Sequence, residues 1–224
     1  DDCSTDNTRT IRRRYANEGK IILLENETNS GAAQSRNKCL AIATKEYIAI
    51  QDADDYCTRK RLERQVTVLE KNTSFDFVST GLQKFYETGE RVDIFPKKEI
   101  PTKDDFLLTI PFMHATTLFR KEILNRVNGY RIAWETRRGQ DYDLFMRIFA
   151  AGGRGININE IHYFYRCFTG YTPRHAYKYR VGEFIIRYKG FKALKLGFKS
   201  VPYIIKPLIL GLIPQGIINK VTGH

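Results

Sequence analysis

The sequence predicts an α/β fold in which helices flank a mostly parallel central sheet and a basic helical tail follows. Two continuous apolar runs, residues 20–25 and 47–50, are typical of strands buried on both faces of a parallel sheet. Amphipathic helical patterns stand before, between and after these runs. This alternation of helix and strand indicates a parallel sheet with helical crossover connections.

Length and composition limit the number of domains and the class of protein. The chain has 224 residues, of which 42% are hydrophobic and 28% charged, so it can form one large domain or one domain with an appendage. No apolar run reaches the roughly 20 residues of a membrane-spanning helix, and no secretory signal stands at the front. We therefore expect a cytoplasmic protein whose four singly spaced cysteines are reduced thiols.

Three helices are expected in the first seventy residues, around the two apolar runs. The second helix follows Gly31, and the third lies within residues 58–72. Helical spacing places Leu62, Val66 and Leu69 on one apolar face of the third helix. Because the chain opens inside a loop motif and not at a methionine, we expect a further strand and helix upstream.

The pattern changes after Asn72, where shorter elements follow one another. Two β-rich runs around residues 87–90 predict a hairpin. The next elements are expected to be a short strand, a short helix, an amphipathic helix and a last strand, within residues 112–119, 120–130, 139–153 and 155–167 respectively.

Positive charge is concentrated at the C-terminal end. The chain carries a formal charge of +12, and residues 174–224 hold ten Lys or Arg against the single acid Glu183, which leaves nine of the twelve charges there. We divide the chain into a domain of residues 1–170 and a basic tail of residues 171–224. The domain is nearly balanced in charge and contains no recognisable nucleic-acid-binding module, so we expect no nucleic-acid partner.

The tail interleaves aromatic and aliphatic residues with lysines. Three prolines are expected to break it into short helices: Pro202, Pro207 and Pro214. This composition fits segments that lie on an anionic membrane surface, where each Lys or Arg contributes about 1 kcal/mol. We therefore expect peripheral contact with the inner face of the cell membrane through the tail.

Carboxylates follow the apolar run of residues 47–50 directly, as Asp52, Asp54 and Asp55. In an open α/β sheet, ligands bind beyond the carboxyl ends of the strands. Carboxylate oxygens suit Mg²⁺ or Mn²⁺, which is normally completed by the phosphates of a substrate. The alternative is an acidic loop that caps the helix after Thr58, and spacing alone does not decide between the two.

Further polar residues precede and follow the first apolar run. Asp1 and Asp2 can accept hydrogen bonds from a base or a ribose. Asn29 and Arg36 stand between the two expected strands, where the arginine can reach a base edge or a phosphate. Taken singly, each of these residues is more often a solvated polar group.

Four stretches in this order carry a resemblance to a known family. "DDCSTDNT", "NSGAAQSRN", "QDADD" and "GQDYDLFMRI" together resemble family 2 glycosyltransferases over about Asp1 to Arg166. The resemblance implies the GT-A fold, which is Rossmann-like, and transfer of a sugar from a nucleotide sugar with inversion at the anomeric carbon.

The resemblance also implies roles for the donor site. Asp2 corresponds to the aspartate that contacts the nucleotide base, and Arg36 to a basic residue near the nucleotide, with Asn29 beside them. "DADD" corresponds to the DxD motif of the family. Asp52 is thereby implied to hold ribose or metal, and Asp54 to bind the Mn²⁺ or Mg²⁺ that bridges the diphosphate.

The implied general base is Asp141, in the place of the aspartate in the Glu-Asp motif of the family. Gln140 replaces the preceding glutamate, and the loss of one neighbouring carboxylate should lower the pKa of Asp141 slightly. The base would deprotonate an acceptor hydroxyl as it attacks the anomeric carbon. Without the resemblance, Asp141 is an ordinary acid at a helix N-terminus.

Two aromatic residues lie near the expected acceptor site. His114 falls between the implied nucleotide and acceptor sites, although a buried structural histidine is the more common situation. Trp134 precedes the implied base by a short loop, where its indole can stack on a sugar or simply pack. Arg137 and Arg138 in the same loop can attract an anionic donor or a lipid diphosphate.

These observations predict an inverting, metal-dependent glycosyltransferase that uses a UDP-sugar at the cytoplasmic membrane face. The expected acceptor is a saccharide or a lipid-linked saccharide of bacterial cell-envelope polysaccharide synthesis. A catalytically impaired nucleotide-binding relative is the alternative that Gln140 favours. A nucleic-acid-binding protein is the alternative that the basic tail favours.

Overall fold

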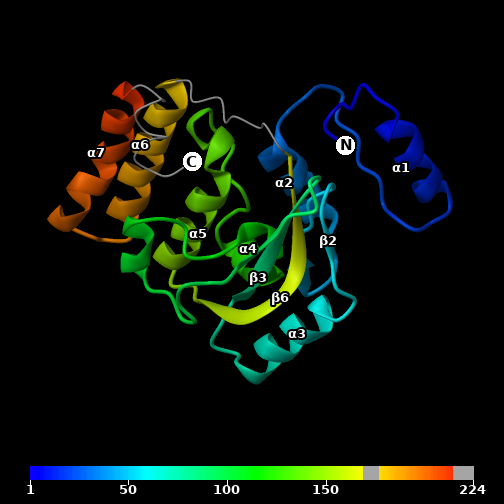
Figure 1. Ribbon diagram of the computed structural model, residues 1–224, viewed down its shortest axis with the longest axis horizontal. Coiled ribbons are helices and arrows are strands. Elements are labelled where there is room, and N and C mark those ends of the chain that lie inside the picture. Colours follow the sequence, from blue (N-terminus) through cyan, green and yellow to red (C-terminus); the bar gives the residue numbers. More distant parts are fainter. Residues whose placement is uncertain (169–176, 214–224) are drawn as a thin grey trace.

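The computed structural model describes residues 1–168 and 177–213 (Figure 1). One mixed sheet of six strands has the order β1-β5-β3-β6-β2, and β4 pairs with β3 outside this path. The strands are β1 Tyr47–Ala49, β2 Tyr56–Cys57, β3 Phe77–Tyr86, β4 Arg91–Ile94, β5 Leu118–Arg120 and β6 Gly155–Cys167. The α-helices are α1 Thr8–Asn17, α2 Ala32–Ile42, α3 Arg61–Lys71, α4 Lys121–Arg126, α5 Gln140–Ala150, α6 Tyr177–Ala193 and α7 Val201–Leu212.

The α/β class is confirmed, but the sheet is mixed and not mostly parallel. Among the described strands β3 and β6 pair in parallel, while the other four pairings are antiparallel. The predicted strand at residues 20–25 is wrong, because this segment pairs with no strand of the described chain and Ile22 is 80% exposed. Its backbone bonds instead to Asp1, which donates to the Leu24 carbonyl at 2.6 Å.

The second half of the chain follows the sequence prediction closely. The hairpin joins β3 to β4, the amphipathic helix is α5 and the last strand is β6. The expected strand of residues 112–119 is shorter, because His114–Thr116 forms a 3₁₀ turn before β5. Gly129, with a φ of 61°, ends the segment after α4 in a left-handed conformation that favours glycine.

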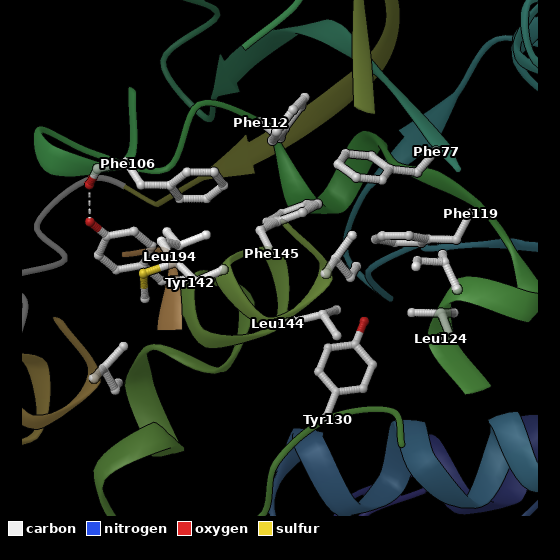
Figure 2. Packing of buried hydrophobic residues seen from close by; sticks show 14 of the residues in the cluster. Phe77, Phe106, Phe112, Phe119, Leu124, Tyr130, Tyr142, Leu144, Phe145 and Leu194 are labelled. Carbon is white, nitrogen blue, oxygen red and sulfur yellow. Dashed lines mark hydrogen bonds between the residues drawn. The ribbon is translucent and has the colours of Figure 1, made fainter. Parts of the chain in front are cut away.

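Aromatic side chains fill the core between the sheet and α5 (Figure 2). The ring of Phe77, at the start of β3, lies 4.7 Å from that of Phe112, 5.4 Å from that of Phe119 and 5.2 Å from that of Phe145, measured between centroids. These are tilted or edge contacts, the geometry that aromatic pairs favour. Gly155 on β6 lies against the Phe77 ring and leaves no room for a Cβ atom.

Helix α3 is rotated relative to the predicted apolar face. Leu62 is 48% exposed, whereas Arg61 and Gln65 are fully buried. The reason is that both polar side chains donate to backbone carbonyls of the neighbouring strands and turn: Arg61 to that of Ile50, and Gln65 to those of Val78 and Thr116. Hydrophobic spacing alone misses this arrangement because it counts only apolar residues.

Within residues 177–213, the described part of the tail forms two α-helices that pack on the rest of the protein. α6 packs against α5, and its Ile186 and Phe191 belong to the same buried cluster as Leu144. The expected break at Pro207 is wrong, because this buried residue lies inside α7. Pro202 occupies the first turn, where a proline is tolerated. The expected break at Pro214 falls outside the described residues.

A helix that crosses a membrane must be long and apolar. None of the helices in residues 1–168 and 177–213 is both long enough and apolar enough to cross a bilayer.

Candidate active site

The acidic segment after β1 is held by hydrogen bonds from β6. Tyr163 donates its hydroxyl to Asp55 at 2.8 Å and accepts a hydrogen bond from the Asp52 backbone at 3.1 Å. The Arg166 backbone also donates to Asp55 at 2.8 Å. Burial is the main reason that the pKa of Asp55 is raised. Asp55 therefore shapes the segment, while the carboxylates of Asp52 and Asp54 remain at the surface.

These two carboxylates fit a divalent cation by their chemistry. Asp54 is exposed, and no described residue donates a hydrogen bond to its carboxylate. Within the described ranges, no three His, Cys, Asp or Glu side chains converge on one point. Asp52 and Asp54 therefore supply hard oxygen ligands, and substrate oxygens or waters would have to complete the coordination.

Beneath this segment lies Arg61, a residue that sequence reasoning did not assign to the site. Its guanidinium is 1% exposed and donates to the Ile50 carbonyl at 2.9 Å and to the Gln51 side chain at 3.1 Å. It also lies 4.9 Å from the centre of the Tyr163 ring. Burial lowers the pKa of Arg61. A buried positive charge thus supports the start of a segment that carries three carboxylates.

Helix α2 brings Arg36 to the same strand end. Its Nη2 lies 3.1 Å from Oδ1 of Asp52, and its guanidinium lies 5.6 Å from the centre of the Tyr130 ring. Both partners of the ion pair are partly exposed, so a ligand can reach them. The structure therefore brings together two residues that stand sixteen positions apart and were assigned to the nucleotide site.

Asp2 organises the loop that precedes α2. Its carboxylate accepts hydrogen bonds from the backbones of Ser30 at 2.7 Å and Gly31 at 2.8 Å, and from the Asn26 side chain at 2.9 Å. Burial raises the pKa of Asp2, but these three hydrogen bonds outweigh it and leave the pKa below its ordinary value. Asn29 is exposed and donates to the Asp2 carbonyl at 3.4 Å. Contact of Asp2 with a base stays a prediction.

Asp141 lies in the first turn of α5 and is mostly buried. Its Oδ1 accepts a hydrogen bond from the Tyr142 backbone at 2.8 Å. Burial raises the pKa of Asp141, and the charge of Arg36 partly offsets this while that of Asp52 adds to it. The rise in the pKa of Asp141 caused by burial is thus larger than the slight decrease expected from Gln140 in place of a glutamate. The charges of the implied nucleotide residues thus act on the implied base.

His114 makes its side-chain hydrogen bond within the protein, and its contact with donor or acceptor stays a prediction. Its Nε2 lies 2.7 Å from the Tyr130 hydroxyl, and burial lowers the pKa of His114 to about 3, with the positive charge of Arg36 acting in the same direction. The imidazole is therefore neutral at physiological pH. It supports Tyr130, on whose ring Arg36 rests.

A cavity of about 350 Å³ adjoins Asp141. Its walls come from the 3₁₀ segment Glu135–Arg138, from α5 and from α6, and they include Trp134, Tyr179 and Arg187. A second hollow of about 200 Å³, lined by Asn29, Gly31 and Gln140, also touches Trp134. Trp134 lines both hollows and is 60% exposed.

The part played by α6 was missed because the tail was assigned to the membrane. Its glycines are the signal that could have indicated close packing. A Cβ at Gly182 would lie 3.0 Å from the Glu135 carbonyl, and Gly190 lies against the Met146 side chain. Glycines eight residues apart on a helix thus allow α6 to approach the wall of the cavity.

The sequence is similar to known glycosyltransferases. Residues 1–127 match the model of the family "Glycosyl transferase family 2". The chain is 38% identical to the putative glycosyltransferase EpsE of Bacillus subtilis over 98% of this chain and 80% of that protein. It is 32% identical to the putative teichuronic acid biosynthesis glycosyltransferase TuaG of Bacillus subtilis, over 71% of this chain and 62% of that protein.

One further relative has a specific activity in its name. It is the UDP-Glc:alpha-D-GlcNAc-diphosphoundecaprenol beta-1,3-glucosyltransferase WfaP of Escherichia coli, which is 27% identical over 80% of this chain and 68% of that protein.

Solved structures show the same fold. S. aureus TarS 1-349 in complex with UDP-GlcNAc superposes with a TM-score of 0.65 at 18% identity, over 95% of this chain and 71% of that one. The mannosyltransferase PcManGT from Pyrobaculum calidifontis, in complex with GDP-Man and Mn²⁺, superposes with a TM-score of 0.55 at 22% identity, over 94% and 57%. The expected GT-A fold is thereby confirmed. The family model, the related sequences and the fold all indicate the same family. The chain belongs to glycosyltransferase family 2, a family of sugar-transferring enzymes.

Proposed function

We propose that this chain transfers a sugar, with inversion, from a UDP-sugar to a hydroxyl of a saccharide or lipid-linked acceptor. The observation that carries the proposal is the ion pair of Arg36 with Asp52, whose charges also act on Asp141, together with the cavity that Asp141 lines. The donor would occupy the strand end, and the acceptor would occupy the cavity. The UDP-GlcNAc bound to TarS supports a UDP-sugar as the donor.

Asp52 and Asp54 would hold Mn²⁺ or Mg²⁺ together with the diphosphate of the donor. When bound, the cation neutralises charge on the leaving diphosphate. The Mn²⁺ in the complex of PcManGT supports this assignment. Arg36 can move from Asp52 to a donor phosphate, because a guanidinium recognises both groups by similar hydrogen bonds.

Asp141 would act as the general base. Its raised pKa makes it a better proton acceptor than an exposed aspartate. The acceptor oxygen forms a bond to the anomeric carbon as the bond to the diphosphate oxygen breaks. The electron pair leaves with UDP, the proton passes to Asp141, and a single displacement inverts the anomeric centre.

The cavity and the tail support proposals for the acceptor and for the location of the enzyme. Trp134 and Tyr179 offer aromatic faces to a sugar ring beside Asp141. The diphosphoundecaprenol acceptor in the name of WfaP supports a lipid-linked saccharide in cell-envelope polysaccharide synthesis. Such an acceptor requires that the protein work at the inner face of the membrane, and the basic tail would provide the peripheral contact.

The first test is calorimetric titration of UDP into the protein with and without Mn²⁺. We expect binding that requires the metal and is lost in Asp54→Ala. Asp141→Asn should retain this binding and lose transfer to a saccharide acceptor. Metal-dependent UDP binding by a parent protein that transfers no sugar to any acceptor would favour a catalytically impaired relative, whereas absent UDP binding would contradict the proposed donor.

A further inference from the structure

The outer face of α7 is an exposed apolar stripe. Its members are separated by three or four positions along the helix and the turn before it, so they lie on one side. This "α7 stripe" consists of Phe198, Val201, Ile205, Ile209 and Leu212. Phe198 is 95% exposed and Leu212 is 75% exposed, which are high values for large apolar side chains.

The stripe does not serve the packing of α7 on the protein. The opposite side of the helix does so, since Pro207 is buried and Tyr203 and Ile204 pack against the central apolar cluster. α7 therefore has two apolar faces, of which one is covered by the protein and the other is open. A continuous exposed apolar face indicates a binding surface.

The charge around the stripe identifies its ligand. Residues 184–224 contain seven Lys or Arg and no Asp or Glu. Lys195, three residues before Phe198, and Lys206, next to Ile205, are exposed, and Lys199 is exposed while paired with Asp104 at 2.8 Å. Protein interfaces are depleted in lysine, whereas apolar residues flanked by lysines are typical of helices that lie on anionic bilayers.

We infer that α7 lies flat on an anionic phospholipid bilayer, with the α7 stripe inserted between the lipids. The lysines then contact the headgroups, and the buried side of α7 remains on the protein. This inference narrows the tail contact of the proposed function to one helical face.

The arrangement of the helices has a consequence for the acceptor. α7 lies outside α6, and α6 lies outside α5, as Figure 1 shows. Residues of α6 line the cavity beside Asp141, and α7 packs against α6. A bilayer against α7 would thus lie roughly one helix diameter, about 10 Å, beyond α6. That separation suits a sugar carried on a lipid diphosphate, and this step rests on the proposed function.

Vesicle sedimentation tests the inference with the whole protein. We expect the protein to sediment with vesicles of phosphatidylcholine and phosphatidylglycerol, and more weakly with phosphatidylcholine alone. The triple variant Phe198→Ser, Ile205→Ser, Leu212→Ser should lose more than about tenfold in vesicle affinity, since it removes three large apolar groups from the bilayer. Ile22→Ser is the matched control, because Ile22 is 80% exposed and lies outside α7. It should bind vesicles like the parent.

The contribution of charge to vesicle binding is measured with the double variant Lys195→Gln, Lys206→Gln and, separately, with added salt. The double variant and the added salt should each weaken binding to the anionic vesicles severalfold. Equal vesicle binding by the parent and the triple serine variant would overturn the inference. A parent dimer that the serine variant loses, without any vesicle binding, would also overturn it and would assign the stripe to a second copy of the chain.

UDP titration of the same variants separates the two proposals. The serine variant should bind UDP and Mn²⁺ like the parent, which also shows that it is folded. If the parent binds vesicles through the stripe and does not bind UDP, the surface assignment stands and the donor assignment fails. If the parent binds UDP and does not bind vesicles, the donor assignment stands and the surface assignment fails.

Discussion

The guanidinium of Arg36 lies 3.1 Å from the carboxylate of Asp52, so α2 and the end of β1 meet through one ion pair. Without a ligand, this pair offsets one of three neighbouring carboxylates. A nucleotide diphosphate would offer Arg36 an alternative partner and leave Asp52 available to a cation or a ribose. We therefore expect this ion pair to break when the donor binds, as Arg36 moves from Asp52 to the diphosphate.

Arg36→Gln should weaken UDP binding in the presence of Mn²⁺ by roughly tenfold to a hundredfold, the loss of one charge-assisted hydrogen bond. Arg36→Lys keeps the charge and loses the fork geometry, so its loss should be intermediate. The measurement is calorimetric titration of both variants. A Gln variant that binds UDP as tightly as the parent would remove Arg36 from the nucleotide site.

Arg61→Met should lower the free energy of unfolding by about 3 kcal/mol, since it leaves the buried Ile50 carbonyl and two glutamine side chains without a donor. Urea denaturation measures this loss. The exposed Arg126, paired with Glu122 at 3.2 Å, gives the matched control Arg126→Met, which should change stability by less than about 0.5 kcal/mol. Equal midpoints for the two variants would show that Arg61 does not support the segment.

Asp141→Asn should reduce the rate of transfer by at least about a hundredfold, the usual contribution of a positioned base. Because burial raises the pKa of Asp141, kcat/KM of the parent should fall with decreasing pH, with an apparent pKa above the ordinary value of 3.8. A pH profile at saturating Mn²⁺ measures this limb. An unchanged rate in the Asn variant would assign the base to another residue.

The same raised pKa predicts an effect of Asp141 on stability. Between the unfolded and the folded pKa, the folded state binds the proton that the unfolded state has lost, so stability falls as pH rises through this window. Asn cannot ionise, and Asp141→Asn should therefore raise Tm at neutral pH and leave it nearly unchanged below pH 3.8. Thermal melts at the two pH values test this, and a variant that is less stable at neutral pH would contradict it.

Trp134→Ala should raise the KM for the acceptor by roughly three- to tenfold through the loss of an aromatic face beside Asp141. The affinity for UDP should change less than the KM for the acceptor, since Trp134 lines the cavity at Asp141 as well as the hollow at Asn29 and does not line the Arg36–Asp52 pair. Trp134→Phe keeps an aromatic face and should restore most of the acceptor affinity. A change confined to UDP affinity would place Trp134 on the donor side.

Much of the fold and of the candidate site was predictable from local patterns. α5, β6 and the β3–β4 hairpin are long or sharply bounded segments, and their periodicity and turn residues identified them. The motif residues also indicated which side chains belong together, and the ion pair of Arg36 with Asp52 agrees with that. The glycosyltransferase family followed from the order of four short motifs, which a single segment could not have shown.

Only the tertiary structure decided the environment of these residues. An apolar run indicates burial but does not name its neighbour, and residues 20–25 lie without a partner strand in the described chain. The buried Arg61 is held partly by the Ala115 carbonyl, which is 54 positions away, so no local pattern could report it. Likewise, the sequence by itself determined that the tail is basic and helical. Long-range packing decided that α6 completes the cavity at Asp141 and leaves one face of α7 exposed.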